Sequence, residues 1–330
     1  STPWAYRYFN ASSTQMRDQS VKTIATSLIF TLIAWHTATA QTSRYAGDPL
    51  LLGAGARALG MGSAYVALSH DATAVYWNPA GLSQLPKREI HVQHAEQFGG
   101  SINHDLLAFG LPITNGGIGV GLVRTGVDGI TLTTLEDPTR PIGPDNRPIV
   151  TNVVGTTDYI FRLAYGRIIN QKLHLGLGLK IIRRDLTVGV GNGFGLNLGL
   201  TYLPAPAIRI GAMIRDITRT RIAFPNGITD RISPSLLIGI ATERAVPKGL
   251  FTASVSAHLN DQKSSGEESK SLQLGLEYLM KRRIAFRLGY KEGHFTAGTG
   301  LHHSNFAIDL AFLEHEQLDN TYRISATLFF

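Results

Sequence analysis

From Glu89 to the end of the chain, apolar and polar residues alternate with a period of two, which is typical of β-strands. The clearest runs cover residues 173–181, 194–202, 251–259, 272–278 and 284–290. In each run one face is apolar, while the other holds glycines and isolated polar or charged residues. A soluble sandwich would favour Lys, Glu and Thr on that second face. The pattern therefore favours a closed barrel whose outer face meets lipid and whose inner face surrounds a lumen.

The connections between these runs alternate in length. Short ones lie near residues 114–117, 170–172, 204–207, 243–248 and 280–283, and longer ones at 127–157, 186–191, 216–231 and 260–270. Outer-membrane barrels combine short periplasmic turns with longer external loops in this way. We expect an all-β fold over residues 89–330, a transmembrane antiparallel β-barrel of about 14 strands with both ends on the periplasmic side.

Residues 16–40 show the three parts of a secretory signal peptide. Residues 16–22 form an n-region, residues 23–35 are apolar, and Ala38-Thr39-Ala40 is a small-x-small cleavage site. The apolar stretch is shorter than the roughly 20 residues of a transmembrane helix, although a single N-terminal membrane anchor is the alternative. We interpret residues 1–15 as an over-extended N-terminus and expect export to the bacterial outer membrane after cleavage.

Residues 41–88 are rich in Gly and Ala and differ from the barrel that follows. Residues 56–69 suit a small buried helix, and the sequence Asn-Pro-Ala-Gly at 78–81 is strong turn chemistry. The segment is too small and too apolar for an independent domain, whereas a Gly-rich inner face leaves room inside a barrel. We expect a small N-terminal helical hatch within the lumen.

The polar residues of this hatch have two interpretations. Arg57, Asp71 and Asn78 could hold the hatch to the wall and gate it, or they could serve ordinary turn and cap chemistry. Trp77 could line a pore, although anchoring is the favoured role. The hatch and gating candidates are Arg57, Asp71, Trp77, Asn78, Pro79 and Ala80.

The last nine residues form a further amphipathic run that ends in Phe. Tyr322, Ile324, Leu328 and Phe330 share one face of it. Such a strand resembles the recognition signal of the barrel-assembly machinery, which we expect as a partner. The alternative is simply the last strand of a sheet.

Composition narrows the function classes. A hydrophobic fraction of 43% argues against disorder, and a charged fraction of 17% lies below the roughly 25% of soluble domains. The absence of Cys excludes disulfides, thiolate metal sites and Cys nucleophiles. The net charge of +7 is spread along the chain without a dense basic stripe, so we expect no nucleic-acid partner.

Three chemical motifs have simpler explanations. The run at 53–58 matches G-x-G-x-x-A, but no good strand precedes it and no βαβ unit follows. His302, His303 and His315 fit no metal-ligand spacing. Ser256 and His258 share a face that suits a polar lumen without specifying a nucleophile and its base. We expect no catalytic, cofactor-binding or metal-binding residues.

Residues 53–67 (GAGARALGMGSAYVA) and 71–82 (DATAVYWNPAGL) resemble the N-terminal segment of the PorV/PorQ family of outer-membrane proteins. That family is related to the FadL fatty-acid transporters, which share the Asn-Pro-Ala element. The resemblance covers the hatch closely and the barrel only through its strand pattern and motifs such as residues 197–204. It implies a fourteen-stranded barrel with an N-terminal hatch.

The resemblance also implies a function. PorV and PorQ belong to the type IX secretion system, so we expect a role in protein secretion or surface attachment, with translocon components or secreted proteins as partners. The alternative is a FadL-like transporter of long-chain fatty acids or other hydrophobic small molecules, with a hydrophobic ligand as partner. A structural barrel in outer-membrane lipid, without a conducted substrate, is the third possibility.

Overall fold

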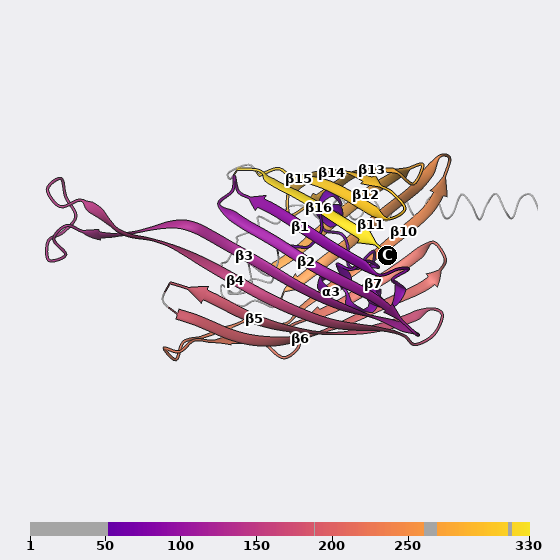
Figure 1. Ribbon diagram of the computed structural model, residues 1–330, viewed down its shortest axis with the longest axis horizontal. Coiled ribbons are helices and arrows are strands. Elements are labelled where there is room, and N and C mark those ends of the chain that lie inside the picture. The colour runs from indigo at the N-terminus through magenta and orange to yellow at the C-terminus, as the bar shows by residue number, and fades with distance from the viewer. Residues whose placement is uncertain (1–51, 188, 261–268, 316–318) are drawn as a thin grey trace, which may run out of the picture. The chain divides into compact units, whose positions relative to one another are not determined.

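The computed structural model describes residues 52–187, 189–260, 269–315 and 319–330. The predicted over-extended N-terminus (1–15), the signal peptide (16–40) and residues 41–51 of the predicted hatch lie outside the described residues. Within the described ranges, no helix combines the length and the apolarity needed to cross a membrane. What is described is mostly β-sheet, with three short helices before the first strand (Figure 1).

Fourteen antiparallel strands of the described chain form one closed wall. The wall strands are β1 (Glu89–Gln97), β2 (Ile102–Ile113), β3 (Gly116–Leu135), β4 (Pro148–Ile168), β5 (Leu173–Leu186), β6 (Gly189–Ala205), β7 (Ile208–Arg215), β10 (Ser235–Val246), β11 (Gly249–Asn260), β12 (Ser269–Met280), β13 (Ile284–Lys291), β14 (His294–His302), β15 (Phe306–Leu313) and β16 (Thr321–Phe329). Two three-residue strands, β8 (Arg221–Ala223) and β9 (Thr229–Arg231), extend the sheet from β6.

The first and last wall strands close the barrel. β1 and β16 pair in antiparallel register from Glu89 opposite Phe329 to Glu96 opposite Tyr322. Closure pairs the edge groups that an open sheet would expose, and lipid cannot hydrogen-bond them. The predicted transmembrane antiparallel barrel of about 14 strands is therefore confirmed.

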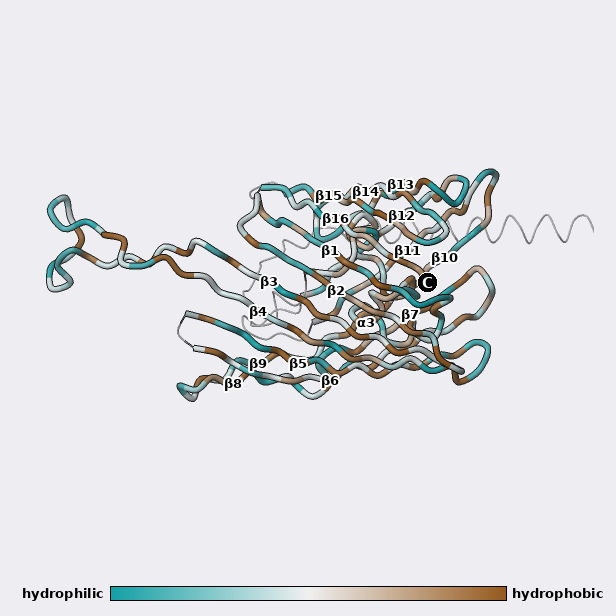
Figure 2. The backbone as a smooth tube through the Cα atoms, viewed as in Figure 1, coloured by the Kyte–Doolittle hydropathy of each residue, from teal (hydrophilic) through white to brown (hydrophobic). Residues whose placement is uncertain are grey.

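Side chains alternate across the wall as the sequence pattern predicts. On β5, Leu175, Leu177 and Ile181 are exposed on the outer face, whereas His174 and Lys180 are buried on the inner face. Figure 2 shows apolar residues along the strands and many hydrophilic residues at the hairpin ends. The outer face has the composition that a lipid environment requires.

The hairpin turns at one end of the barrel are all short. They lie at residues 114–115, 169–172, 206–207, 247–248, 281–283 and 303–305, and residues 86–88, before β1, lie at the same end. We call this the short-turn end and the opposite one the long-loop end. The long-loop end also has short connections, one of which was expected to be long. β5 and β6 pair up to Leu186 opposite Gly189, so the long connection predicted at 186–191 is wrong. Glu292 and Gly293, both with positive φ, form a two-residue hairpin turn.

The connection predicted as a loop at 127–157 is mostly strand. β3 and β4 continue to pair after their other neighbours end, from Val127 opposite Thr156 to Leu135 opposite Pro148. This two-stranded extension, residues 127–156, projects from the long-loop end in Figure 1, and we call it the arm. At its tip, the Asn146 amide donates to the carbonyl oxygens of Asp137 and Arg140 and fixes the loop.

The outward position of Leu177 gives a direct test of the membrane-facing wall. Leu177 is 49% exposed and lies opposite the outward Leu198 of β6. We expect Leu177→Arg to lower the free energy of unfolding from lipid vesicles by about 2–4 kcal/mol, because the guanidinium would sit in hydrocarbon. Urea titration followed by tryptophan fluorescence measures this, with Leu177→Met as the control. Equal stability of the two variants would place residue 177 in water.

Candidate functional site

The lumen is occupied by the chain segment that precedes β1. We call residues 52–88 the inner segment; it contains α2 (Ala56–Gly60), α3 (Ala74–Trp77) and the 3-10 helix η2 (Pro79–Gln84). Almost all its residues from Gly53 to Leu85 are buried. The expected single helix at 56–69 is wrong, because α2 ends at Gly60 and a series of turns follows. This arrangement makes the contact between inner segment and wall the candidate functional site.

Arg57 joins the inner segment to a charge network on the wall. Its Nη2 and Nε lie 2.7 and 3.0 Å from the two carboxylate oxygens of Glu277 on β12, a two-point contact. Arg287 on β13 pairs with the same carboxylate. Arg287 also lies 2.8 Å from Asp309 on β15, which contacts His302 on β14. One cation of the inner segment thus completes a buried network across four strands.

Asp71 acts within the inner segment. Its Oδ1 accepts a hydrogen bond from the backbone N–H of Thr73, and its Oδ2 accepts one from the Tyr65 hydroxyl. Burial raises the pKa of Tyr65 well above its ordinary value, so the phenol keeps its proton and donates. Arg57 donates in turn to the Tyr65 hydroxyl. Asp71 therefore combines turn chemistry with indirect support of Arg57.

Asn78 bonds both to its own turn and to the wall. Its Oδ1 accepts from the N–H of Ala80 at the start of η2, where Pro79 occupies the first position. Its Nδ2 donates to the carbonyl oxygens of Val66 and of Leu200 on β6, each at 3.0 Å. One side chain thus serves the turn and also bonds to the wall, while a gating role stays a prediction.

Tyr76 and Trp77, the two residues before Asn78, hydrogen-bond to the beginning of the inner segment. Trp77 Nε1 donates to the Ala54 carbonyl at 2.7 Å, and the Tyr76 hydroxyl accepts from the N–H of Gly53. The guanidinium carbons of Arg162 and Arg215, both from the wall, lie 4.6 and 5.1 Å from the centre of the Tyr76 ring. These distances are typical of cation–π interactions. Arg215 also lies 5.8 Å from the centre of the Trp77 ring, so Trp77 contacts the wall as well as Ala54.

Glycines on the inner face allow backbone-to-backbone approach. A Cβ on Gly176 would lie 2.1 Å from Ala80 N, and one on Gly289 would lie 2.1 Å from Gly62 N. A Cβ on Gly211 would lie 2.4 Å from the Val66 carbonyl oxygen. No side chain fits at such distances, so the Gly-rich face of the wall matches the shape of the inner segment.

Several wall residues that the sequence did not single out hold α2. The N–H groups of Gly55, Ala56 and Gly62 donate to Gln93, Ser325 and Thr296, respectively. Glu277, Arg287 and Asp309 were missed as well. Each could have been recognised as a charged residue on the inner face of an alternating strand. Their partners could not, because these depend on which strands become neighbours.

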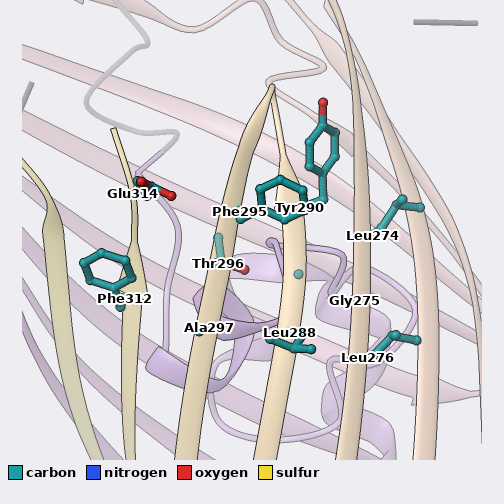
Figure 3. A pocket seen from close by; sticks show the side chains of 11 residues that line it. Leu274, Gly275, Leu276, Leu288, Tyr290, Phe295, Thr296, Ala297, Phe312 and Glu314 are labelled. Atoms are coloured by element: carbon teal, nitrogen blue, oxygen red, sulfur yellow. The ribbon is translucent and has the colours of Figure 1, made fainter. Parts of the chain in front are cut away.

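An apolar groove lies on the outer face of the wall, opposite the contact between the wall and the inner segment (Figure 3). It has a volume of about 340 Å³. Leu276, Leu288 and Phe295 flank it, while Gly275 and Gly289 belong to its floor. On the inner side, Met61 and Gly62 press against the same two glycines. The wall is therefore thin between the lipid-facing groove and the two residues that follow α2.

The predicted assembly signal lies on β16. Tyr322, Ile324, Leu328 and Phe330 are all exposed on the outer face. Recognition of this face by the assembly machinery stays a prediction. The histidines are separated in the structure: His302 belongs to the charge network, whereas His315 packs near Phe98 and His294.

Comparison with protein families and curated sequences gives one match. Residues 27–152 match the model of an uncharacterised protein family, UPF0164. Comparison with curated protein sequences finds no significant match.

Solved structures share the fold at low sequence identity. The CymD monoaromatic hydrocarbon channel has a TM-score of 0.60 at 15% identity, covering 85% of this chain and 98% of its own. The Pseudomonas putida toluene transporter TodX has a TM-score of 0.56 at 14% identity, covering 83% and 97%. A Pseudomonas aeruginosa FadL homologue has a TM-score of 0.50 at 13% identity, covering 88% and 99%. The chain therefore has the fold of FadL-like outer-membrane channels, and none of these comparisons points specifically to PorV or PorQ.

The Arg57–Glu277 contact gives a test of how the inner segment is held. Glu277→Gln leaves Arg57 and Arg287 without their shared anion, and breaking a buried pair costs about 3–5 kcal/mol. We expect faster trypsin cleavage after Arg57 and a lower unfolding temperature in detergent.

The control is Asp105→Asn, which breaks an exposed pair with Arg124 on the outer face. Exposed pairs contribute only about 0–1 kcal/mol. If both variants are cleaved at the rate of the parent protein, the charge network does not hold the inner segment.

Proposed function

We propose that the protein conducts small hydrophobic molecules across the outer membrane, with the inner segment acting as its hatch. The observation that carries this proposal is a closed wall whose lumen is occupied by a segment of the same chain. A conduit of this kind needs a plug that keeps the barrel sealed between passages. The shared fold with hydrocarbon channels supports the proposal, and it favours transport over protein secretion.

The two halves of the inner segment differ in how they are held. Around α3 and η2, Val75, Tyr76, Leu82 and Leu85 belong to an apolar cluster that includes wall residues such as Ile160. The α2 half has a smaller apolar contact, of Ala56 and Leu59 with Ala311 and Leu313 on β15, and is otherwise held by hydrogen bonds and by the Arg57–Glu277 pair. Hydrogen bonds between neutral groups can be exchanged for contacts with water at modest net cost, and Glu277 keeps its pair with Arg287 when Arg57 moves away. We therefore assign the movable part of the hatch to α2 and the fixed part to α3 and η2.

A reversible cross-link tests this assignment. The N–H of Ala56 lies 3.2 Å from Ser325 Oγ, and the chain has no natural Cys. A variant with Ala56→Cys and Ser325→Cys would tie α2 to β16 when oxidised. We expect oxidation to suppress uptake of radiolabelled toluene or oleate by cells that carry the protein in their outer membrane, and a reductant to restore uptake.

The control cross-link joins two wall strands, through Ser256→Cys and Gln273→Cys, which pair directly on β11 and β12. It should leave uptake unchanged. Unchanged uptake after oxidation of the Ala56–Ser325 pair would contradict a moving α2. Uptake no faster than in cells without the protein would contradict conduction itself.

Secretion or surface attachment, with type IX translocon components or secreted proteins as partners, stays a second proposal because of the arm. Ile142, Ile149, Val150 and Val153 are strongly exposed on it. The arm projects beyond the other described strands, and an isolated two-stranded hairpin is marginally stable in water. A partner that covers these residues would stabilise it.

Removing the arm separates the two functions. A variant with residues 128–155 replaced by Asn-Gly keeps all wall strands, and we expect it to take up toluene and oleate as the full chain does. Mass spectrometry of both proteins purified from native outer membranes identifies bound proteins. A stoichiometric translocon component that is lost with the arm would favour secretion over conduction.

A further inference from the structure

Basic residues gather at one end of the barrel. Within residues 86–88, 114–115, 167–172, 206–209, 243–248, 281–283 and 303–305, the short-turn end has one acidic residue, Glu243. Its ten basic residues are Lys87, Arg88, Arg167, Lys172, Arg209, Arg244, Lys248, Lys281, Arg282 and Arg283. We call these ten residues the basic rim.

The long-loop end carries both signs of charge among its described residues. Its connections and the arm hold nine acidic residues, Asp128, Glu136, Asp137, Asp145, Asp216, Asp230, Glu292, Glu314 and Asp319, and five basic ones, Arg140, Arg147, Arg219, Arg221 and Arg231. The strand ends beside them add basic residues such as Arg183, Arg215, Lys270 and Lys291 and acidic ones such as Glu96 and Asp185. An excess of one sign is therefore concentrated at the short-turn end.

The basic rim is largely unneutralised by the protein. In the described part of the chain, its one ion pair is between Arg209 and Glu243, at 3.1 Å. Lys87 reaches only a carbonyl oxygen, that of Ser304. Apart from Arg209, all rim residues are exposed. So many unpaired like charges repel one another, and an external anion would relieve that repulsion.

The position of the basic rim indicates which kind of anion binds it. Arg167 follows the exposed Tyr165 on the outer face of β4, and Arg244 follows the exposed Ile240 on the outer face of β10. Their guanidinium groups therefore lie where the lipid-facing apolar surface ends. Basic side chains at this depth extend along the apolar surface and place their charge among lipid headgroups.

The rim also surrounds much of the barrel. Its members lie before β1, between β4 and β5, around the β10–β11 turn and between β12 and β13. A protein partner would require charge gathered on one side, whereas the surrounding lipid contacts the whole circumference. We infer that the basic rim binds the headgroups of anionic phospholipids in the leaflet at the short-turn end, and that this fixes the barrel's position in the membrane.

The test compares lipid retention by matched variants. The rim variant carries Gln in place of Arg167, Lys172, Arg244, Lys248, Lys281 and Arg282. The control variant carries Gln in place of six exposed residues at or near the long-loop end: Arg140, Arg147, Arg183, Arg219, Arg221 and Arg231. Both lose the same charge. Each full-length protein is reconstituted in vesicles of equal phosphatidylglycerol and phosphatidylcholine, extracted in mild detergent, and analysed by native mass spectrometry.

We expect the parent and control proteins to retain phosphatidylglycerol in preference to phosphatidylcholine. The rim variant should lose that preference by at least about tenfold, because each basic residue near an anionic surface adds attraction. A change in gel mobility on boiling shows that each variant is folded.

Two results would overturn the inference: a parent protein without preference, or a preference that falls equally in both variants. Polyglutamate serves as the probe for a different occupant. If it binds the parent but not the rim variant, while lipid preference is absent, the rim serves an acidic protein instead.

Discussion

The pairing of β1 with β16 is the constraint on which the rest of the structure depends. In lipid, an unpaired backbone group costs several kcal/mol, so the sheet has to close before its strands can span the membrane. Closure at fourteen strands leaves a lumen too wide for wall side chains alone to fill. The inner segment occupies that space, and it enters next to the closing pair because residue 88 leads directly into β1. The pairing of β1 with β16 therefore closes the sheet and also brings the inner segment into the lumen.

Filling a polar lumen sets a second requirement, which the inner segment and the wall meet together. The inner segment has few regular hydrogen bonds, since α2 and α3 comprise only five and four residues. Its remaining backbone groups need partners, and wall residues such as Gln93, Thr296 and Arg323 supply them. Gly176 and Gly289 allow the two backbones to meet. A contact of this kind is specific in shape, yet much of it consists of polar groups that water can also satisfy.

Local pattern determines how much of this could be predicted from the sequence. The alternation around Leu177 fixes which face meets lipid, so the barrel and most short turns were predictable. The arm was not, because Pro138, Pro141, Pro144 and Pro148 give the middle of residues 127–157 the composition of a loop. The pairing of Arg57 with Glu277 was also hidden. It links residues 220 positions apart, and it exists only because closure brings β12 and α2 together. Charged residues on an inner face indicate that a charge network exists, but the sequence does not show which residues pair.

The distribution of polar contacts argues for where movement can occur. The large apolar cluster around Leu82 fixes α3 and η2 to the wall, whereas α2 lies against β13–β16 through hydrogen bonds and a small apolar contact of Leu59 with Leu313. The wall beside α2 is also the part that carries the groove of Figure 3. At Gly275 and Gly289 only a backbone separates lipid from Met61 and Gly62. Under the proposed function, a shift of α2 opens the lumen beside this groove, while the other half of the inner segment stays anchored. The proposal thus assigns sealing and opening to one segment because apolar packing holds its two halves unequally.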